Sequence, residues 1–232
     1  MAIHLPQIDE NGLPTDYLMG LTGDFGIEVT VVQWNEYPYE GGGCGEEPPI
    51  GHHADVMLCL DRSGSISGYE SYLQTAAKAF VTALLAPDDG QVGIVSFATT
   101  ATLDTTFSTD ITYLHGIIDG LVFTGSTNLE QGIQLSQNEL ATADRTPDSD
   151  PDPTVTVYPD YMVIITDGAP TAGGDPTDDA TAAKAAGTRI FVLGIGLTNP
   201  TTVALMTAIA SPGDYYDVAD WTLLEALLLS LV

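Results

Sequence analysis

Basic residues are scarce in this sequence. Its 232 residues include only 5 Lys and Arg against 32 Asp and Glu, which gives a formal net charge of -27 at neutral pH. A surface so poor in cations repels polyanions, so we expect no binding of nucleic acid or of anionic membranes through a basic face. Two interpretations of the charge stay open: adaptation to a salty, halophilic or marine medium, where ions screen the self-repulsion, and a surface that collects divalent cations.

Long apolar runs are also lacking. The closest to a membrane span is the final segment, Leu223 to Val232, which is too short to cross a bilayer and contains Glu225. The opening segment, Met1 to Glu10, lacks the basic region and the sustained apolar core of a secretory signal. We therefore expect neither membrane insertion nor a signal peptide, while export by another route stays open.

Cysteine is represented by only 2 residues, Cys44 and Cys59. Cys59 lies within an apolar run and is expected to be a small buried residue, whereas Cys44 lies in a glycine-rich loop. A disulfide between them would tie a linker to a buried strand and is the less favoured alternative. The spacing of Cys and His is not typical of a zinc site.

Apolar strand-like runs alternate with segments of helical periodicity along most of the chain. The predicted strands are 56–60, 91–97, 102–107, 161–166, 189–195 and 215–218, and the predicted helices are 69–85, 109–121, 129–141, 177–186, 200–210 and 221–231. This order predicts an α/β fold: a doubly wound, mostly parallel central sheet with helices on both faces. The short connection between 91–97 and 102–107 predicts a hairpin, and so one antiparallel edge strand.

The first 53 residues differ from the rest of the chain. They contain one strand-like stretch, Phe25 to Trp34, and a linker rich in Gly and Pro that ends near residue 53. We therefore predict an N-terminal arm and linker at 1–53 and a domain at 54–232. The arm either folds back on its own domain or, through residues 1–40, contacts copies of this chain or neighbouring subunits, since an isolated strand can join another sheet.

One loop interrupts the alternation of strands and helices. Residues 144–159 are rich in Pro and Asp, which excludes a helix. Asp148, Asp150 and Asp152 alternate there and could hold Ca²⁺, but the spacing lacks the glycine and distal Glu of an EF-hand loop. A solvated acidic loop is the favoured interpretation.

Oxygen-bearing side chains follow predicted strands or precede a predicted helix at three places. Asp61, Ser63 and Ser65 follow the run 56–60, Thr127 stands just before the helix 129–141, and Asp167 follows the run 161–166. In such sheets ligands bind outside the carboxyl ends of the strands. Two carboxylates and three hydroxyls form an all-oxygen set that suits a hard cation such as Mg²⁺.

These residues resemble the metal-ion-dependent adhesion site of von Willebrand factor type A domains, which integrin inserted domains share. The shared pattern is Asp-x-Ser-x-Ser, then Thr, then Asp-Gly, in this order along the chain. The resemblance covers residues 54–232. It implies Mg²⁺, with Mn²⁺ or Ca²⁺ as alternatives, completed by a Glu or Asp of a partner protein. Arg62 either helps to receive that acidic partner or is a solvated turn residue. Asn128 and Gly168 are also candidates for contact with the partner, and we expect them to shape the loops rather than to bind the metal.

Three classes of function remain. The resemblance and the complete site favour a metal-dependent binding or adhesion module on an extracellular or virion-like surface. A structural subunit of such an assembly, using the arm, is the second, and an adaptor beside a chelatase-type ring ATPase is the third. We expect no enzyme, because His4, His52, His53 and His115 lie outside the metal loops, although metal-assisted hydrolysis stays an alternative. We also expect no conformational switch of the last helix.

Overall fold

The computed structural model describes residues 50–51, 53–86, 90–142 and 158–232. The predicted strand at 25–34 and the rest of the arm up to residue 49 lie outside the described residues. So does the possible calcium loop with Asp148, Asp150 and Asp152.

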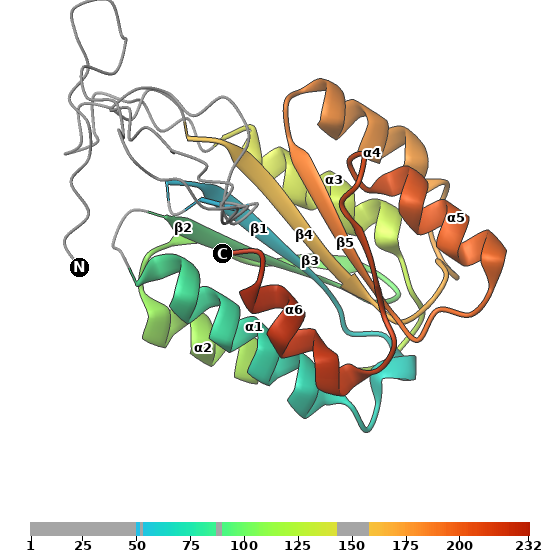
Figure 1. The fold of residues 1–232 in the computed structure, drawn as a ribbon, viewed down its shortest axis with the longest axis horizontal. Helices are drawn as coiled ribbons and strands as arrows, with labels where there is room; N and C mark the ends of the chain where they lie inside the picture. The colour runs from blue at the N-terminus through green and yellow to red at the C-terminus, as the bar shows by residue number, and fades with distance from the viewer. Residues whose placement is uncertain (1–49, 52, 87–89, 143–157) are drawn as a thin grey trace, which may run out of the picture. The chain divides into compact units, whose positions relative to one another are not determined.

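The centre of the domain is a 6-stranded sheet with the order β3-β2-β1-β4-β5-β6 (Figure 1). Its strands are β1 (Asp55–Asp61), β2 (Gln91–Phe97), β3 (Ala101–Ser108), β4 (Asp160–Thr166), β5 (Arg189–Ile195) and β6 (Tyr215–Val218). Every neighbouring pair is parallel except β2 and β3, which pair antiparallel across a short connection. The predicted fold class, including the antiparallel edge strand, is confirmed.

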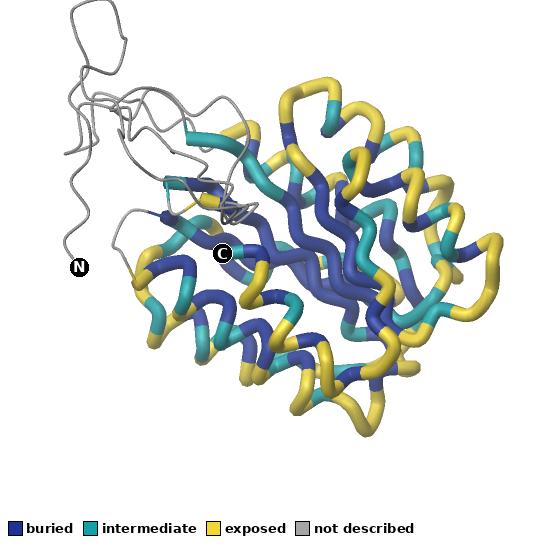
Figure 2. Tube along the Cα trace, viewed as in Figure 1, coloured by how far each residue is buried: buried dark blue, intermediate teal, exposed yellow. Residues whose placement is uncertain are grey.

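Helices cover both faces of the sheet because its central strands are apolar on both sides. Alternate residues of β1 face opposite ways: Val56, Leu58 and Leu60 join one core cluster, while Met57 and Cys59 join the other. One face carries α1 (Glu70–Leu85), α2 (Ile111–Asp119) and α6 (Leu224–Leu229), and the other carries α3 (Leu129–Leu140), α4 (Pro176–Ala185) and α5 (Pro200–Ile209). Figure 2 shows the strands as the buried layer between these helices.

Helix α3 approaches the sheet closely at Gly132. A Cβ atom at this position would lie 3.0 Å from the Cys59 sulfur and 3.0 Å from a ring carbon of Phe97. The absence of a side chain therefore lets α3 pack tightly over β1 and β2. Cys59 is fully buried, as predicted, and this burial raises the pKa of its thiol to about 12.

The end of the chain differs from the prediction of one helix over 221–231. It begins with a short 3₁₀ helix, Trp221–Leu223, and continues as α6. The Asp220 carboxylate accepts a hydrogen bond from the Thr222 N–H, which caps the 3₁₀ turn. The Trp221 ring stacks on Tyr69, and regular α-helix begins at Leu224.

The order of the strands reverses between β1 and β4. Strand β2 follows β1 in the chain and pairs with one edge of β1, whereas β4 pairs with the opposite edge of β1 and β5 lies beyond β4. Such a reversal opens a crevice at the carboxyl ends of the strands. Within the described residues, no helix is long and apolar enough to cross a membrane.

Candidate metal centre

The last residue of β1 forms the buried base of the site. Asp61 has no exposed surface, and its Oδ1 accepts a hydrogen bond of 2.8 Å from the Ser63 N–H. The chain then turns through a short 3₁₀ helix, Gly64–Ile66, which brings the Ser65 hydroxyl to 3.0 Å from the Ser63 hydroxyl. Ser63 is buried and Ser65 is exposed, so the oxygens lead from the core to the surface.

The end of β4 supplies the second carboxylate. The Ser65 hydroxyl donates to Asp167 Oδ1 at 2.7 Å, and the Thr166 hydroxyl donates to Asp61 Oδ2 at 2.7 Å. Four of the five predicted ligands therefore lie in one chain of hydrogen-bonded or directly adjacent groups. Thr166 was not predicted as part of the site. Its signal in the sequence is a hydroxyl residue directly before the aspartate that ends a buried strand.

Thr127 reaches the same edge of the sheet through the backbone of its segment. The Gly64 N–H donates to the Gly125 carbonyl at 3.0 Å, and the Asn128 N–H donates to the Ala98 carbonyl at 2.7 Å. Gly125 has a φ of 91°, and a Cβ atom there would lie 2.5 Å from the Thr99 hydroxyl, so this turn requires glycine. Thr127 is 5% exposed, next to the N-terminus of α3.

Burial and mutual repulsion disfavour the charged form of the two carboxylates. Burial, and to a lesser degree the Asp167 charge, raises the pKa of Asp61 to about 6, against hydrogen bonds from Ser63 and Thr166 that lower it. Burial also raises the pKa of Asp167, opposed by its hydrogen bond from Ser65. A cation between these groups would offset both effects.

Comparisons with known proteins identify the family of this domain. A sequence model of the von Willebrand factor type A domain matches residues 55–229. The chain belongs to the von Willebrand factor type A (vWA) domain family. A search of curated proteins gave no match.

Solved structures with the same fold include a thread matrix protein and a pilus adhesin. Proximal thread matrix protein 1 from the mussel byssus is 20% identical with a TM-score of 0.63, over 81% of this chain and 48% of that one. The pilus adhesin SpaC from Lactobacillus rhamnosus GG, in its open conformation, is 18% identical with a TM-score of 0.60, over 82% of this chain and 30% of that one.

A further structure of the mussel protein, described as having a zinc-occupied metal-ion-dependent adhesion site, is 19% identical with a TM-score of 0.58, over 78% of this chain and 46% of that one. This chain thus spans less than half of the length of each of these three matched chains. At these identities the likeness concerns the fold alone.

The oxygen donors of this vWA domain fit a hard cation. Two carboxylates and three hydroxyls would bring two negative charges and no nitrogen or sulfur. Among the described residues, no group of three or more His, Cys, Asp or Glu could hold a metal ion. A cation here would therefore depend on the hydroxyls and on water as much as on carboxylates.

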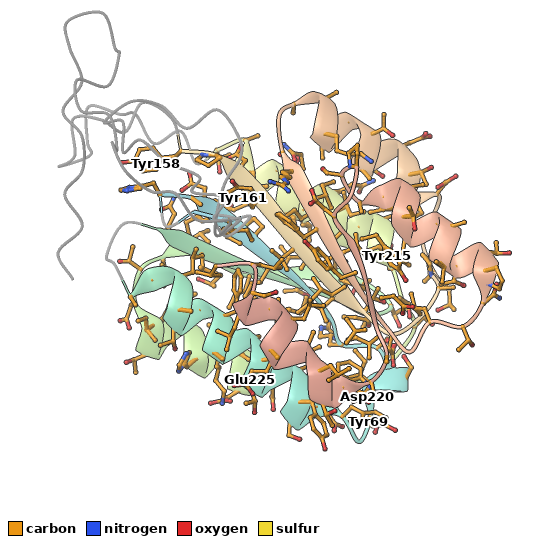
Figure 3. All side chains as sticks on the ribbon, in the orientation of Figure 1. Tyr69, Tyr158, Tyr161, Tyr215, Asp220 and Glu225 are labelled. Atoms are coloured by element: carbon orange, nitrogen blue, oxygen red, sulfur yellow. The ribbon has the colours of Figure 1, made fainter. Side chains whose placement is uncertain are left out.

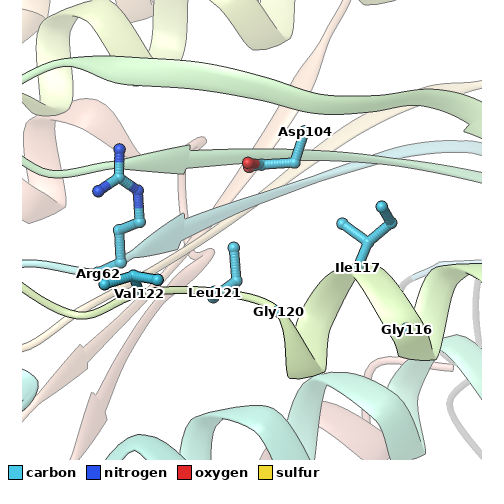
Figure 4. A pocket seen from close by; sticks show the side chains of 7 residues that line it. All are labelled: Arg62, Asp104, Gly116, Ile117, Gly120, Leu121 and Val122. Carbon is cyan, nitrogen blue, oxygen red and sulfur yellow. The ribbon is translucent and has the colours of Figure 1, made fainter.

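Arg62 lies between the predicted ligands in sequence, but its guanidinium is directed toward β2 and β3. Its Nε donates to the Ser96 hydroxyl at 2.9 Å, and Arg62 and Asp104 line a cavity of about 350 Å³ beside α2 (Figure 4). The structure thus places the side chain in a partly buried polar contact. Its expected contact with a partner stays a prediction.

Asn128 and Gly168 both take part in the loops around the site. The Asn128 side chain caps α3 by accepting a hydrogen bond of 3.2 Å from the Gln131 N–H. The Gly168 N–H lies 3.3 Å from the Thr166 hydroxyl, which contacts Asp61 in turn. Both contacts fit the loop-shaping roles expected for these residues.

Proposed function

We propose that this vWA domain is a protein-binding or adhesion module that depends on a divalent metal. Asp61, Ser63, Ser65, Thr127 and Asp167 hold Mg²⁺, directly or through water, and an acidic residue of a partner completes its coordination. Mn²⁺ and Ca²⁺ are alternatives. The neighbours' names support the adhesive role, since they include a pilus adhesin and a byssal thread protein with a zinc-occupied adhesion site.

One observation carries the proposal: the hydrogen-bonded series of oxygens from Asp61 to Asp167. It begins at a fully buried carboxylate and ends at the exposed Ser65 and the half-buried Asp167. A cation bound there has protein oxygens on its inner side and solvent on its outer side. Because Mg²⁺ keeps water where protein ligands are missing, an incoming carboxylate can replace that water.

The same geometry favours binding over catalysis. The hydroxyls of Ser63 and Ser65 lie 3.0 Å apart, and the Ser65 hydroxyl donates to Asp167, a carboxylate that this proposal assigns to the metal and not to the activation of a nucleophile. His115 lies on α2, with its Nε2 3.2 Å from the Thr82 hydroxyl and 3.1 Å from the Lys78 carbonyl. We therefore propose that the metal serves recognition.

A calorimetric titration of Mg²⁺ into the metal-free chain tests the proposal. The wild type should show saturable binding at one site, and Asp167→Ala should lose most of it because a charged ligand is gone. Asp178→Ala is the matched control, since it removes an exposed aspartate from α4 and leaves the site intact. Equal binding by all three proteins would refute the metal site and favour the alternative function, a structural subunit of an assembly.

A further inference from the structure

A second cavity opens directly beside the metal centre. It measures about 470 Å³ and shares Asp167 with the metal ligands. Its other walls come from the start of α1, with Tyr69 and Tyr72, and from the segment before α6, with Asp220 and Trp221. Figure 3 shows Tyr69 and Asp220 together at this end of the domain.

Aromatic rings form one wall of this cavity. The rings of Tyr69 and Trp221 stack with centroids 5.6 Å apart at 12°, and Tyr72 lies 6.5 Å from Tyr69. Trp221 is only 7% exposed, whereas Tyr69 and Tyr72 are 46% and 44% exposed. A buried ring thus fixes one exposed ring from below, so the wall exists before any partner arrives and costs little to order.

The wall is rigidly connected to the metal loop. The 3₁₀ turn Gly64–Ile66 follows Ser63, and the Tyr69 N–H donates to the Ile66 carbonyl at 2.8 Å. Tyr69 then accepts from the Tyr72 N–H at 3.0 Å as α1 begins. A ligand at the metal and a ligand at the rings would therefore occupy fixed positions relative to each other.

Negative charge surrounds the rings. Hydrogen bonds from Thr222 to the exposed Asp220 carboxylate lower its pKa, which keeps it ionised at neutral pH. Asp167 also lines the cavity, but its charge is offset when it binds the metal, so Asp220 supplies the carboxylate beside the rings. Among the described residues that line this cavity there is no Lys or Arg. The whole chain carries a net charge of -27, so the surrounding field also attracts cations.

We infer that this cavity receives a Lys or Arg side chain of the partner whose acidic residue completes the metal. The inference rests on the proposed function and names the partner more closely: a segment with an acidic and a basic residue near each other. Tyrosine faces attract an ammonium or guanidinium group, and the Asp220 carboxylate adds charge complementarity. An extended segment advances about 3.3 Å per residue, so neighbouring positions can reach both places.

Short glycine-based peptides provide the probes. One series carries a single Asp with a Lys one or two positions away, and the matched series carries Gln in place of Lys. Binding in saturating Mg²⁺ is followed by NMR through the indole signal of Trp221, assigned with Trp34→Phe. We expect the Lys peptides to bind about 5- to 10-fold more tightly than the Gln peptides, as a cation over aromatic rings contributes.

Three variants test whether the preference for Lys over Gln peptides arises in this cavity. Tyr72→Leu and Asp220→Asn should each remove most of it, and asparagine keeps an oxygen that can cap Thr222. Tyr113→Leu is the control, because Tyr113 is 48% exposed on α2 and does not line the cavity. The preference for Lys should persist in that variant.

The outcomes separate this inference from the proposed function. Equal, Mg²⁺-dependent binding of Lys and Gln peptides would refute the basic subsite and leave the metal-dependent module standing. A Trp221 response to a neutral oligosaccharide but not to Lys peptides would replace the inference with a sugar-stacking surface. Peptide binding that is indifferent to Mg²⁺ would overturn the proposed function, and this inference with it.

Discussion

The two ends of strands β1 and β4 each carry a pair of aspartates, and at the carboxyl ends the described residues add the hydroxyls of Ser63, Ser65 and Thr166. At the amino ends, Asp55 and Asp160 are register partners, and at the carboxyl ends Asp61 and Asp167 are joined through Ser63 and Ser65. Burial and the Asp55 charge both raise the pKa of Asp160 to about 6. Carboxylates facing each other are therefore present at both ends.

The difference lies in the groups around the carboxylates. The pKa of Asp61 is also raised to about 6, but hydrogen bonds from Ser63 and Thr166 oppose the burial that raises it. These donors hold the carboxylate in one orientation, and the neighbouring hydroxyls supply further oxygens toward the surface. We propose that the oriented hydroxyls, and not the carboxylate pair alone, make the carboxyl ends a cation site.

Substitution of one aspartate at each end should give the largest contrast. Asp61→Asn should weaken Mg²⁺ binding by about 100-fold or more, since even outer partners of metal ligands contribute 10- to 100-fold. Asp160→Asn should leave the affinity unchanged. Calorimetry on the metal-free proteins measures both.

A melting curve without metal controls for misfolding of Asp61→Asn. Asparagine can still accept the hydrogen bond from Ser63, and it removes a buried charge, so the variant should melt no lower than the wild type. Equal weakening by both substitutions would mean that overall charge, not the local site, sets the affinity.

Thr166→Val should have the next largest effect. It removes the donor that holds Asp61 Oδ2 while keeping the volume of the side chain, and we expect Mg²⁺ affinity to fall about 10-fold. Thr105→Val is the control, because the Thr105 hydroxyl bonds only the carbonyl of the next residue, far along β3 from the site. If both variants bind Mg²⁺ like the wild type, Thr166 has no role in orienting the ligand.

The amino ends should contribute to the way in which stability responds to pH. A folded-state pKa of about 6 for Asp160 lies above the ordinary value of 3.8, so the folded form retains a proton that the unfolded form has released. Stability should therefore fall as pH rises from about 4 to about 6, by about 1 kcal/mol for this half-exposed group after solvent screening.

Urea unfolding at several pH values, with chelator present, measures this slope. Asp160→Asn should reduce this slope, and part of the remaining slope should come from Asp61 and Asp167, whose pKa values are also raised. A slope that is unchanged in Asp160→Asn would show that the contact with Asp55 does not control the titration.

The sequence predicted the fold and the carboxyl-end site for the same reason. Apolar runs mark the buried strands, and the polar residue that ends each run must lie at the edge of a parallel sheet. The place of Asp61 and Asp167 follows from that rule. The family match over residues 55–229 confirms the recognition of the domain.

The remaining features depend on contacts between distant segments. Thr166 lies beside Asp61 only because Ile165 pairs with Leu60, a register that neither strand shows by itself. The stacking of Tyr69 on Trp221 joins residues that lie near the two ends of the domain's sequence. Such contacts arise from packing, which local patterns of hydropathy and turn residues do not encode.

Arg62 offers the smallest expected effect and the finest test of the comparison. It is the cation nearest in sequence to the ligands, yet its contacts with Ser96 and the Thr100 carbonyl direct it away from them. Arg62→Gln removes one positive charge and should raise Mg²⁺ affinity by less than about 3-fold at low salt, with no change at high salt. Calorimetry at two salt concentrations measures it. A larger change in Mg²⁺ affinity that persists at high salt would place the guanidinium within the metal centre. The charge of Arg62 would then affect Mg²⁺ affinity as much as the oriented hydroxyls do.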